Sequence, residues 1–491
     1  MDPRTPVVVG VGTAGGRPAE GTSNPEPVDL MASAARAAAA DAGASELVEH
    51  LEMVIVPRGT WPYHDAAGLV AERLGAPAPR RVVAELGILQ TTLVAHAADA
   101  IAAGGIEVAL VVGAEARWRD IQAKKAGGQA PMTADAGAVP DDVLRPDSPL
   151  VTPEERAVGL IDAPSQYSML ENATRFEAGK TLAEHSRGIA ELWAGFNDVA
   201  RAYPEAWNRQ PFSVDDLEGE GAGRLLAFPY RKWHVSQWNV DQAGAVLLCS
   251  LAAARRFGLP SDQWVFPHAI TWSDHMIPLS QRQDLAFSPG FGAAGREAFS
   301  LAGLNADDVA HLDLYSCFPV AVRHQAQALG LGLERQLTLT GGMTFGGGPL
   351  NNYALQSLPA MVRTLRADPG SVGLVTSVSG MVTKQGVSLW STEPPAGGYR
   401  SAEVGNAVAQ VSATLPLAPA GDHEGTLATY SALADPAGTP QRAVAVVDVA
   451  AGGRAVAVSH DPELAAALTT EEWCGRRVVL REGTWFPAGT S

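Results

Sequence analysis

Cysteine is scarce in this sequence, and its scarcity excludes two kinds of site. The 491 residues include 3 cysteines, Cys249, Cys317 and Cys474. An odd number of widely spaced cysteines implies no disulfide framework. No group of cysteines and histidines has the spacing of a metal site either. We therefore expect a protein without a disulfide framework and without a metal. We expect no nucleotide redox cofactor either.

Long apolar runs and excess positive charge are also missing. No apolar run approaches the about 20 residues that a membrane span requires, and the amino terminus lacks a signal-peptide pattern. The net charge of −17 argues against a broad surface for nucleic acid or anionic membranes. We expect a soluble, cytoplasmic protein that binds neither, and in which an anionic ligand needs a local basic patch.

Short apolar runs alternate with helical segments over residues 1–113. Predicted strands cover 7–11, 53–56, 81–86 and 108–113, and predicted helices cover 30–42, 66–74 and 91–103. Continuously apolar strands that alternate with helices indicate βαβ units and a parallel sheet covered on both faces. The first quarter of the chain therefore predicts an α/β fold.

The alternation stops at about residue 114 and resumes after residue 230. We interpret 114–230 as an insertion over the carboxyl edge of the sheet, with one predicted helix at 181–200. Beyond it, predicted strands cover 245–248, 265–270, 312–314, 372–378 and 387–390, and predicted helices cover 293–301, 320–329 and 354–366. Two similar halves indicate a duplicated fold, although no sequence repeat is visible.

A proline- and glycine-rich linker, Glu393-Pro394-Pro395-Ala396-Gly397-Gly398, precedes the last segment. Short strands are predicted there at 408–411, 426–430, 442–447, 454–458 and 477–480, with a spacing near that of small β-barrels. We therefore expect four parts: a first half at 1–113 with 231–242, an inserted loop domain at 114–230, a second half at 243–398, and a carboxyl-terminal β domain at 399–491.

The segment Tyr315-Ser316-Cys317-Phe318 lies where a predicted strand passes into a helix. Pro319 suits the first helical position. At such a junction the helix amides stabilise negative charge and lower the pKa of a thiol. The segment therefore predicts a site centred on Cys317 and Tyr315. A thiol that only packs in the core is the alternative for Cys317.

Several spaced segments, in order along nearly the whole chain, resemble the thiolase superfamily, in particular thiolase-like proteins type 1, which carry an additional carboxyl-terminal β domain. The resemblance implies an α/β thiolase fold, a duplicated βαβαβαββ unit in five αβαβα layers, and a coenzyme A thioester as substrate. The segments are Pro6-Val7-Val8-Val9-Gly10-Val11-Gly12, Asn239-Val240-Asp241-Gln242-Ala243-Gly244-Ala245, Tyr315-Ser316-Cys317-Phe318-Pro319, Gly347-Gly348-Pro349-Leu350-Asn351-Asn352-Tyr353 and Ser391-Thr392-Glu393-Pro394-Pro395.

The resemblance also shows which thiolase residues this chain lacks. The position of the acylated cysteine falls on Gly87, and the histidine of the GHP motif falls on Gly348. The CxG motif matches Val378-Ser379-Gly380-Met381, which has no thiol. Relatives often carry Thr-Lys-His where this chain has Thr383-Lys384-Gln385. The glycines around Gly348 either offer backbone amides to an oxyanion or serve only a tight loop.

Cys317 matches the cysteine of the HDCF motif, an acid/base group in thiolases of the sterol carrier protein type, and Tyr315 replaces its histidine. Superfamily aldolases of steroid side-chain degradation also lack the nucleophile and are thought to use tyrosines in this neighbourhood. Asn239, His234 and Tyr353 are further candidates, each with a core hydrogen-bonding or packing role as its alternative. Basic candidates for coenzyme A are Arg231, Lys232 and Lys384.

Three functions stay open at this point. The first is a thiolase-superfamily enzyme that performs aldol or retro-aldol chemistry on an acyl-CoA or related thioester, without an acyl-cysteine at the usual position. The second is acetyl-CoA acetyltransferase-like acyl transfer with Cys317 as nucleophile. The third is a non-catalytic acyl-CoA-binding or scaffold protein, with a small OB-fold partner or with its own β domain in that place. Homodimer and monomer are both compatible with the sequence.

Overall fold

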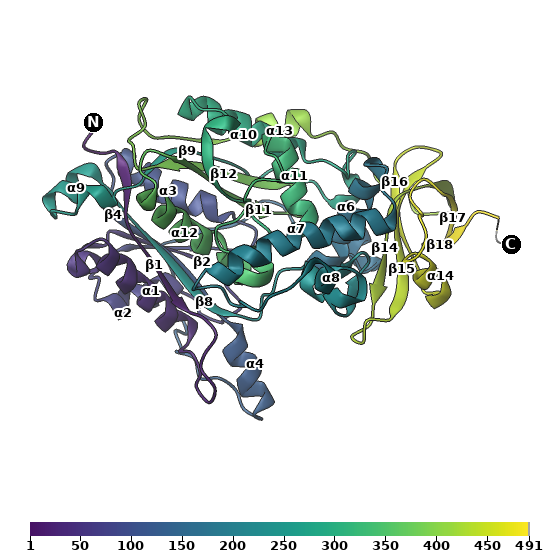
Figure 1. Cartoon of the computed structure of the whole chain (residues 1–491), viewed down its shortest axis with the longest axis horizontal. Helices are drawn as coiled ribbons and strands as arrows, with labels where there is room; N and C mark the ends of the chain where they lie inside the picture. Colours follow the sequence, from purple (N-terminus) through teal and green to yellow (C-terminus); the bar gives the residue numbers. More distant parts are fainter. Residues whose placement is uncertain (490–491) are drawn as a thin grey trace.

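The computed structural model describes residues 1–489 and forms three β-sheets in that range (Figure 1). The first sheet has the order β1 (Pro6–Gly15), β8 (Asp241–Ser250), β4 (Val108–Ala116), β2 (Met53–Pro57), β3 (Arg80–Ala84) and β5 (Asp142–Leu144). The second has the order β10 (Val309–Asp313), β11 (Val372–Ser379), β12 (Lys384–Ser391), β9 (Phe266–Ser273) and β13 (Arg400–Glu403).

The third sheet joins the end of the chain to the insertion. Its order is β16 (Arg454–Ser459), β15 (Pro440–Val449), β14 (His423–Ala434), β17 (Arg477–Arg481) and β18 (Thr484–Pro487), and β6 (Leu225–Ala227) pairs with both β14 and β7 (Tyr230–Arg231). Helix α14 (Pro462–Ala467) packs on β15. The amino terminus and strand β18 lie at opposite ends of the molecule (Figure 1).

Helices cover and separate the first two sheets. α1 (Pro27–Asp41) and α2 (Ala66–Leu74) cover the outer face of the first sheet, and α9 (Leu251–Arg256) follows β8. α3 (Gln90–Ala102) and α12 (Ala354–Ala367) lie between the sheets. α10 (Pro289–Ala302) and α11 (Pro319–Leu329) cover the outer face of the second sheet. This arrangement confirms the five αβαβα layers expected of a thiolase fold.

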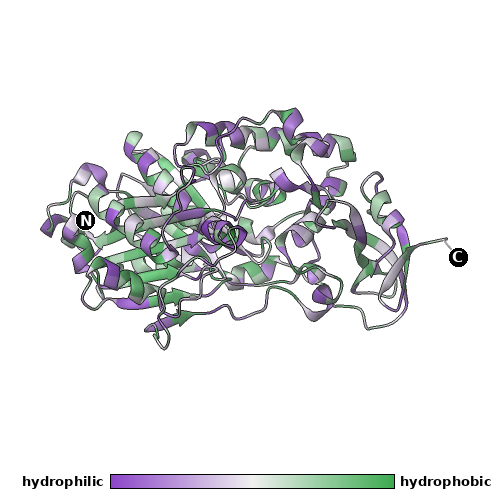
Figure 2. Ribbon diagram, turned by 90° about the horizontal axis from the view of Figure 1, so that it is seen from below, coloured by the Kyte–Doolittle hydropathy of each residue, from purple (hydrophilic) through white to green (hydrophobic). Residues whose placement is uncertain are grey.

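Local signals explain where these elements begin and how they are buried. The Asp65 side chain accepts a hydrogen bond from the Gly68 amide at the start of α2. Gly75 then ends that helix with a left-handed φ of 73°. All residues of β8 are buried, as expected for a strand covered on both faces. Figure 2 shows hydrophobic residues gathered along the strands of this part of the molecule.

The insertion contains more regular structure than its sequence pattern indicates. Its helices are α4 (Arg117–Lys125), α5 (Pro153–Ala157), α6 (Ala163–Glu177), α7 (Leu182–Ala202) and α8 (Val214–Leu217). α7 confirms the helix predicted at 181–200. α6 was not expected, although Asp162 and Ser165 form a capping box at its start and Pro164 lies in its first turn. That local signal marks the helix in retrospect.

Three expectations about the sheets are wrong in detail. The first sheet is mixed, because β8 runs antiparallel to both β1 and β4. Because β8 belongs to the first sheet, that sheet includes the chain through Ser250, whereas we expected the first half to end at residue 242. The predicted strand at 408–411 is part of helix α13 (Gly405–Val411), which packs on α10 through Val408. A four-residue apolar pattern does not distinguish a strand from a short helix.

Candidate active site

Four loops meet at the carboxyl edges of the two central sheets. They lead from β3 into α3, from β10 into α11, from the glycine-rich segment 341–349 into α12, and from β11 into β12. Hydrogen bonds join these loops. Gln90 at the start of α3 donates to Asn351 Oδ1 at 2.8 Å, and the Tyr315 amide donates to Thr376 Oγ1 on β11 at 2.8 Å. These loops carry five of the positions that the sequence singles out: Gly87, Tyr315, Cys317, Gly348 and Tyr353.

Cys317 is buried between phenols just before α11. Tyr167, from α6, hydrogen-bonds the thiol, and the Tyr167 ring stacks on Phe318 with 4.3 Å between ring centroids. Burial raises the pKa of Cys317 to about 12, although this hydrogen bond and the backbone amides act in the opposite direction. The amides at the start of the helix do lower this pKa, as expected, but desolvation of the thiolate is the larger effect, so the net shift is upward and the expected low pKa is wrong. At neutral pH the side chain is a thiol.

Tyr315 and Tyr353 form a second pair. Their rings meet edge to face, with centroids 5.5 Å apart. The Tyr353 hydroxyl donates to Asp313 Oδ1 at 3.0 Å, and it lies 2.9 Å from Thr340 Oγ1. Burial raises the pKa of Asp313 to about 6, although hydrogen bonds from Leu339 and Tyr353 lower it. Burial also raises the pKa of both phenols, so both are protonated at neutral pH.

Gly87 and Lys384 meet across the two halves. Gly87 follows β3 with a φ of +107°, a conformation that favours glycine, so a cysteine there would strain the loop. Lys384 Nζ donates to the Gly87 carbonyl at 3.2 Å, and Asp274 Oδ1 lies 3.6 Å from the same nitrogen. Lys384 is fully buried. Its ammonium therefore faces protein groups and not solvent, where the phosphates of coenzyme A would lie.

The backbone amide of Gly348 is already engaged. It donates to the Gln237 carbonyl at 3.1 Å, so it is not free to bind an oxyanion in this structure. A Cβ at this position would lie 2.0 Å from Ser236 Oγ. The segment around Ser236 also runs beside the thiol loop, because the Ser236 amide donates to the Cys317 carbonyl at 3.0 Å. The loop thus has no room for a histidine at 348 without a shift of Ser236.

Asn239 and His234 make structural hydrogen bonds. Asn239 Oδ1 accepts from Arg117 Nε at 3.0 Å. His234 Nδ1 accepts from the Arg231 amide at 3.3 Å, and its Nε2 lies 2.8 Å from the Leu217 carbonyl oxygen. Burial lowers the pKa of His234 to about 4, so its ring is neutral. With both ring nitrogens occupied, His234 positions the end of the insertion.

Arg231 and Lys232 are half-buried at the end of the insertion. Arg231 Nη1 donates to the Gly223 carbonyl at 2.9 Å, and Lys232 Nζ donates to Gln237 Oε1. Burial lowers the pKa of Lys232, and the nearby charge of Arg224 lowers it further. Each cation is therefore tied to a protein acceptor.

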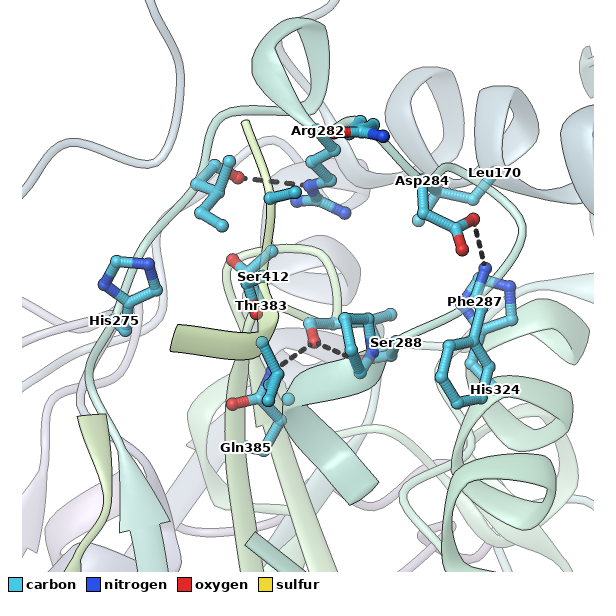
Figure 3. A pocket seen from close by; sticks show the side chains of 17 residues that line it. Leu170, His275, Arg282, Asp284, Phe287, Ser288, His324, Thr383, Gln385 and Ser412 are labelled. Carbon is cyan, nitrogen blue, oxygen red and sulfur yellow. Dashed lines mark hydrogen bonds between the residues drawn. The ribbon is translucent and has the colours of Figure 1, made fainter. Parts of the chain in front are cut away.

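A cavity of about 270 Å³ lies on the outer side of the second sheet (Figure 3). Cys317 and Tyr315 are not among its lining residues. It nevertheless borders the same elements, because Leu170 follows Tyr167 by about one turn of α6. Sequence reasoning missed this cavity, since its lining is dispersed along the chain. The lining includes Leu170, Arg282, Ser288, His324, Thr383 and Gln385.

Two cavity residues have distinctive surroundings. Burial lowers the pKa of His324 to about 4, and its Nε2 lies 2.9 Å from Thr174 Oγ1. Gln385 Nε2 donates to the Val382 carbonyl at 3.0 Å, whereas its Oε1 is buried without a partner among residues 1–489. In the same part of the chain, no group of three or more His, Cys, Asp or Glu residues is placed to hold a metal ion. No helix there is long and apolar enough to cross a membrane.

Comparisons with known proteins extend these observations. The chain is similar to the crystal structure of a monomeric SCP2-thiolase-like protein type 1 from Mycobacterium smegmatis, at 30% identity over 99% of this chain and 100% of that chain, with a TM-score of 0.83. It is also similar to the Ltp2–ChsH2(DUF35) aldolase, at 19% identity over 80% and 99% of the two chains, with a TM-score of 0.60. The second likeness shows the shared fold alone.

A curated protein gives a weaker match. An acetyl-CoA acetyltransferase from Methanothermobacter thermautotrophicus is 23% identical over 277 residues, which cover 51% of this chain and 70% of that protein. No family model matches the chain.

Proposed function

The chain belongs to the thiolase superfamily, in the group of SCP2-thiolase-like proteins type 1, and on this premise we propose that it performs aldol or retro-aldol chemistry on an acyl-CoA thioester. No acyl-cysteine forms at the usual position in this reaction. The observation that carries the proposal is the combination of a glycine at that position with a retained thiol, Cys317, buried between phenols.

Cys317 and Tyr315 are the acids in this proposal. Burial keeps both side chains protonated at neutral pH. A thiol with a pKa of about 12 is a poor nucleophile, because the thiolate is the reactive form. It can still deliver a proton to a carbanion that forms beside it. The same argument disfavours acyl transfer through Cys317.

Tyr353 and Asp313 form the base in this proposal. With a pKa of about 6, Asp313 is mostly ionised at neutral pH, and it already accepts a hydrogen bond from Tyr353. The Tyr353 hydroxyl can therefore take a proton from a substrate hydroxyl while it passes its own proton to Asp313. The edge-to-face contact with Tyr315 places base and acid side by side.

In the retro-aldol direction the substrate is a β-hydroxyacyl thioester. The base takes the proton of a β-hydroxyl, a carbonyl C=O bond forms there, and the adjacent C–C bond breaks. The electron pair of that bond moves into the thioester enolate, and an acid then protonates the enolate carbon. A β-hydroxyacyl thioester thus yields an aldehyde or ketone and a shorter acyl thioester. The half-buried Arg231 and Lys232 stay our candidates for the phosphates of coenzyme A.

The test is incubation with a panel of β-hydroxyacyl-CoA thioesters, with intact protein mass and small-molecule products measured together. We expect an aldehyde or ketone and a shorter acyl-CoA, without a mass increase of the protein. Cys317→Ala is expected to slow the reaction by about 100-fold or more.

Two other outcomes would contradict this proposal. A stable mass increase that Cys317→Ala abolishes would favour covalent acyl transfer. Binding without product across the whole panel would favour a non-catalytic acyl-CoA-binding protein. The placement of Cys317 outside the cavity lining is the observation that favours the binding protein.

The appended β domain takes the place of an OB-fold partner in our proposal. It docks on α6, where Asn172 Nδ2 donates to the Tyr430 carbonyl at 2.9 Å and Thr429 Oγ1 donates to the Met169 carbonyl at 2.6 Å. Arg175 and Glu472 form an ion pair across the same contact. These contacts hold the carboxyl-terminal β domain on α6. We therefore propose that the chain acts without a separate OB-fold partner protein.

We expect the purified protein to be a monomer. β5 covers the free edge of β3, and Asp142 and Asp141 pair with Arg80 and Arg81 at 2.6 and 2.9 Å. β5 itself is three residues long and lies between Pro140 and Pro146, which makes it a poor edge for pairing with a second chain. Analytical ultracentrifugation should give the mass of one chain. A species of twice that mass at micromolar concentration would contradict this expectation.

A further inference from the structure

Lys384 is a buried cation with too few partners. Within residues 1–489 its ammonium makes one hydrogen bond shorter than 3.5 Å, to the Gly87 carbonyl. An ammonium has three N–H donors, and buried polar groups are nearly always hydrogen-bonded. Asp274 Oδ1 lies 3.6 Å away and forms a long ion pair with the ammonium. The ammonium therefore has donors to spare.

Other unpartnered polar groups lie beside the same loop, at the start of α3. Gln90 Oε1 and Thr92 Oγ1 are buried without partners in the described part of the chain, and so are both amide atoms of Asn352. Gln90 and Asn352 are 3% and 2% exposed, so solvent does not satisfy them. The Gln90–Asn351 hydrogen bond connects the two segments. Buried polar groups without partners need an explanation in a native protein, and a polar ligand beside them would satisfy them.

The first turn of α3 adds to the positive potential. The helix is 13 residues long, and no side chain caps its start at Leu89. The Thr92 amide already donates to the Leu89 carbonyl at 3.1 Å, whereas the amides of Gln90 and Thr91 have no side-chain cap and can face an anion or a partly negative oxygen. Gly87, just before this turn, presents its backbone carbonyl to Lys384, and a Cβ there would meet Pro146 and not the ammonium.

We propose that Lys384 is a catalytic residue that binds the thioester oxygen of the substrate and stabilises the negative charge of its enolate. This inference rests on the proposed function and adds to it the group that holds the developing charge. When the C–C bond breaks, charge accumulates on the thioester oxygen, and a fixed, buried cation stabilises that charge strongly. Lys384 keeps its proton throughout and forms no covalent bond.

Access to Lys384 requires one local movement. Pro146 covers Gly87, because its Cγ lies 3.2 Å from where a Gly87 side chain would begin. Residues 145–150 contain no helix or strand, and most of them are half-buried or exposed. A thioester that reaches the ammonium therefore displaces this loop.

The experiment uses acetoacetyl-CoA, whose enolate absorbs in the near ultraviolet. The double variant Lys384→Met with Asp274→Asn removes both charges together, so that no unpaired charge stays buried. We expect it to fold and to bind the thioester, as checked by circular dichroism, melting temperature and calorimetry. Its bound enolate at neutral pH should be about 100-fold less abundant than in the wild type. Lys180→Met, at an exposed position in the insertion, is the control and should leave the absorbance unchanged.

The outcomes separate this inference from the proposed function. An enolate absorbance in the folded, binding double variant that equals the wild type overturns the role of Lys384 and leaves the aldol proposal standing. Wild-type protein that binds acetoacetyl-CoA without any enolate absorbance also overturns it. Wild-type protein that binds no acyl-CoA at all contradicts the proposed function itself.

Discussion

Replacement of Glu171 by glutamine is expected to lower the free energy of unfolding by about 3–5 kcal/mol, because it removes the charge that compensates a buried cation. Glu171 is fully buried. Its Oε1 lies 2.6 Å from His185 Nε2 and 2.5 Å from Arg323 Nη1, and its Oε2 accepts from the Tyr230 hydroxyl at 2.5 Å. The network joins α6, α7 and α11, and Tyr230 packs against Phe318 beside the thiol.

The same carboxylate makes the stability depend on pH. Burial raises the pKa of Glu171, but the charge of Arg323 and the hydrogen bonds from His185 and Tyr230 lower it to about 2. The folded-state pKa is thus below the ordinary value of 4.5. The stability that Glu171 contributes is therefore complete above pH 4.5 and is lost as the pH falls toward 2. The Glu171→Gln variant has no carboxylate to protonate, so its free energy of unfolding should fall less than that of the wild type as the pH falls below 4.5.

Urea unfolding at pH 7, 4.5 and 3 measures both effects. Glu191→Gln is the matched control, because Glu191 forms an exposed ion pair with Arg187 at 3.3 Å. Such surface pairs contribute about 0–1 kcal/mol. Equal unfolding free energies for the two variants at pH 7 would refute the structural role of the Glu171 network.

Replacement of Tyr315 by phenylalanine is expected to reduce turnover of a β-hydroxyacyl-CoA by about 10²–10⁴-fold, the usual effect of losing a general acid. The substitution keeps the ring and its contact with Tyr353. It also keeps the bonds that hold residue 315 in place, which come from its backbone: the amide donates to Thr376, and the carbonyl accepts from Gln325 at 2.8 Å. The fold should therefore be unchanged, and the loss should appear in kcat more than in KM.

Steady-state kinetics with a melting-temperature measurement distinguish chemistry from stability. Tyr203→Phe is the control, because the Tyr203 hydroxyl donates to Glu205 at 2.8 Å, outside the four loops of the site. Full activity in Tyr315→Phe would remove Tyr315 from the mechanism and leave Cys317 as the proton donor.

The sequence alone determined the layered fold, and its motifs predict which catalytic residues of a thiolase this chain lacks. Apolar strands that alternate with helices are local patterns, and the buried strands β2, β4 and β11 and helix α2 lie where the patterns predict them. The spaced motifs placed Gly87 where a thiolase has its nucleophile, and they located Tyr315 and Cys317 at the end of a strand. The catalytic roles of these residues stay predictions.

Other features depend on contacts between residues that are distant in the chain. Lys384 lies 297 residues from its acceptor Gly87, and Tyr167 reaches Cys317 from a helix in the insertion that the pattern did not indicate. The protonation state of Cys317 could also be inferred only from the structure. The local sequence places the thiol at a helix start, which favours the thiolate, whereas its burial favours the thiol. Burial is set by all the elements that pack around a residue, and no local pattern contains it.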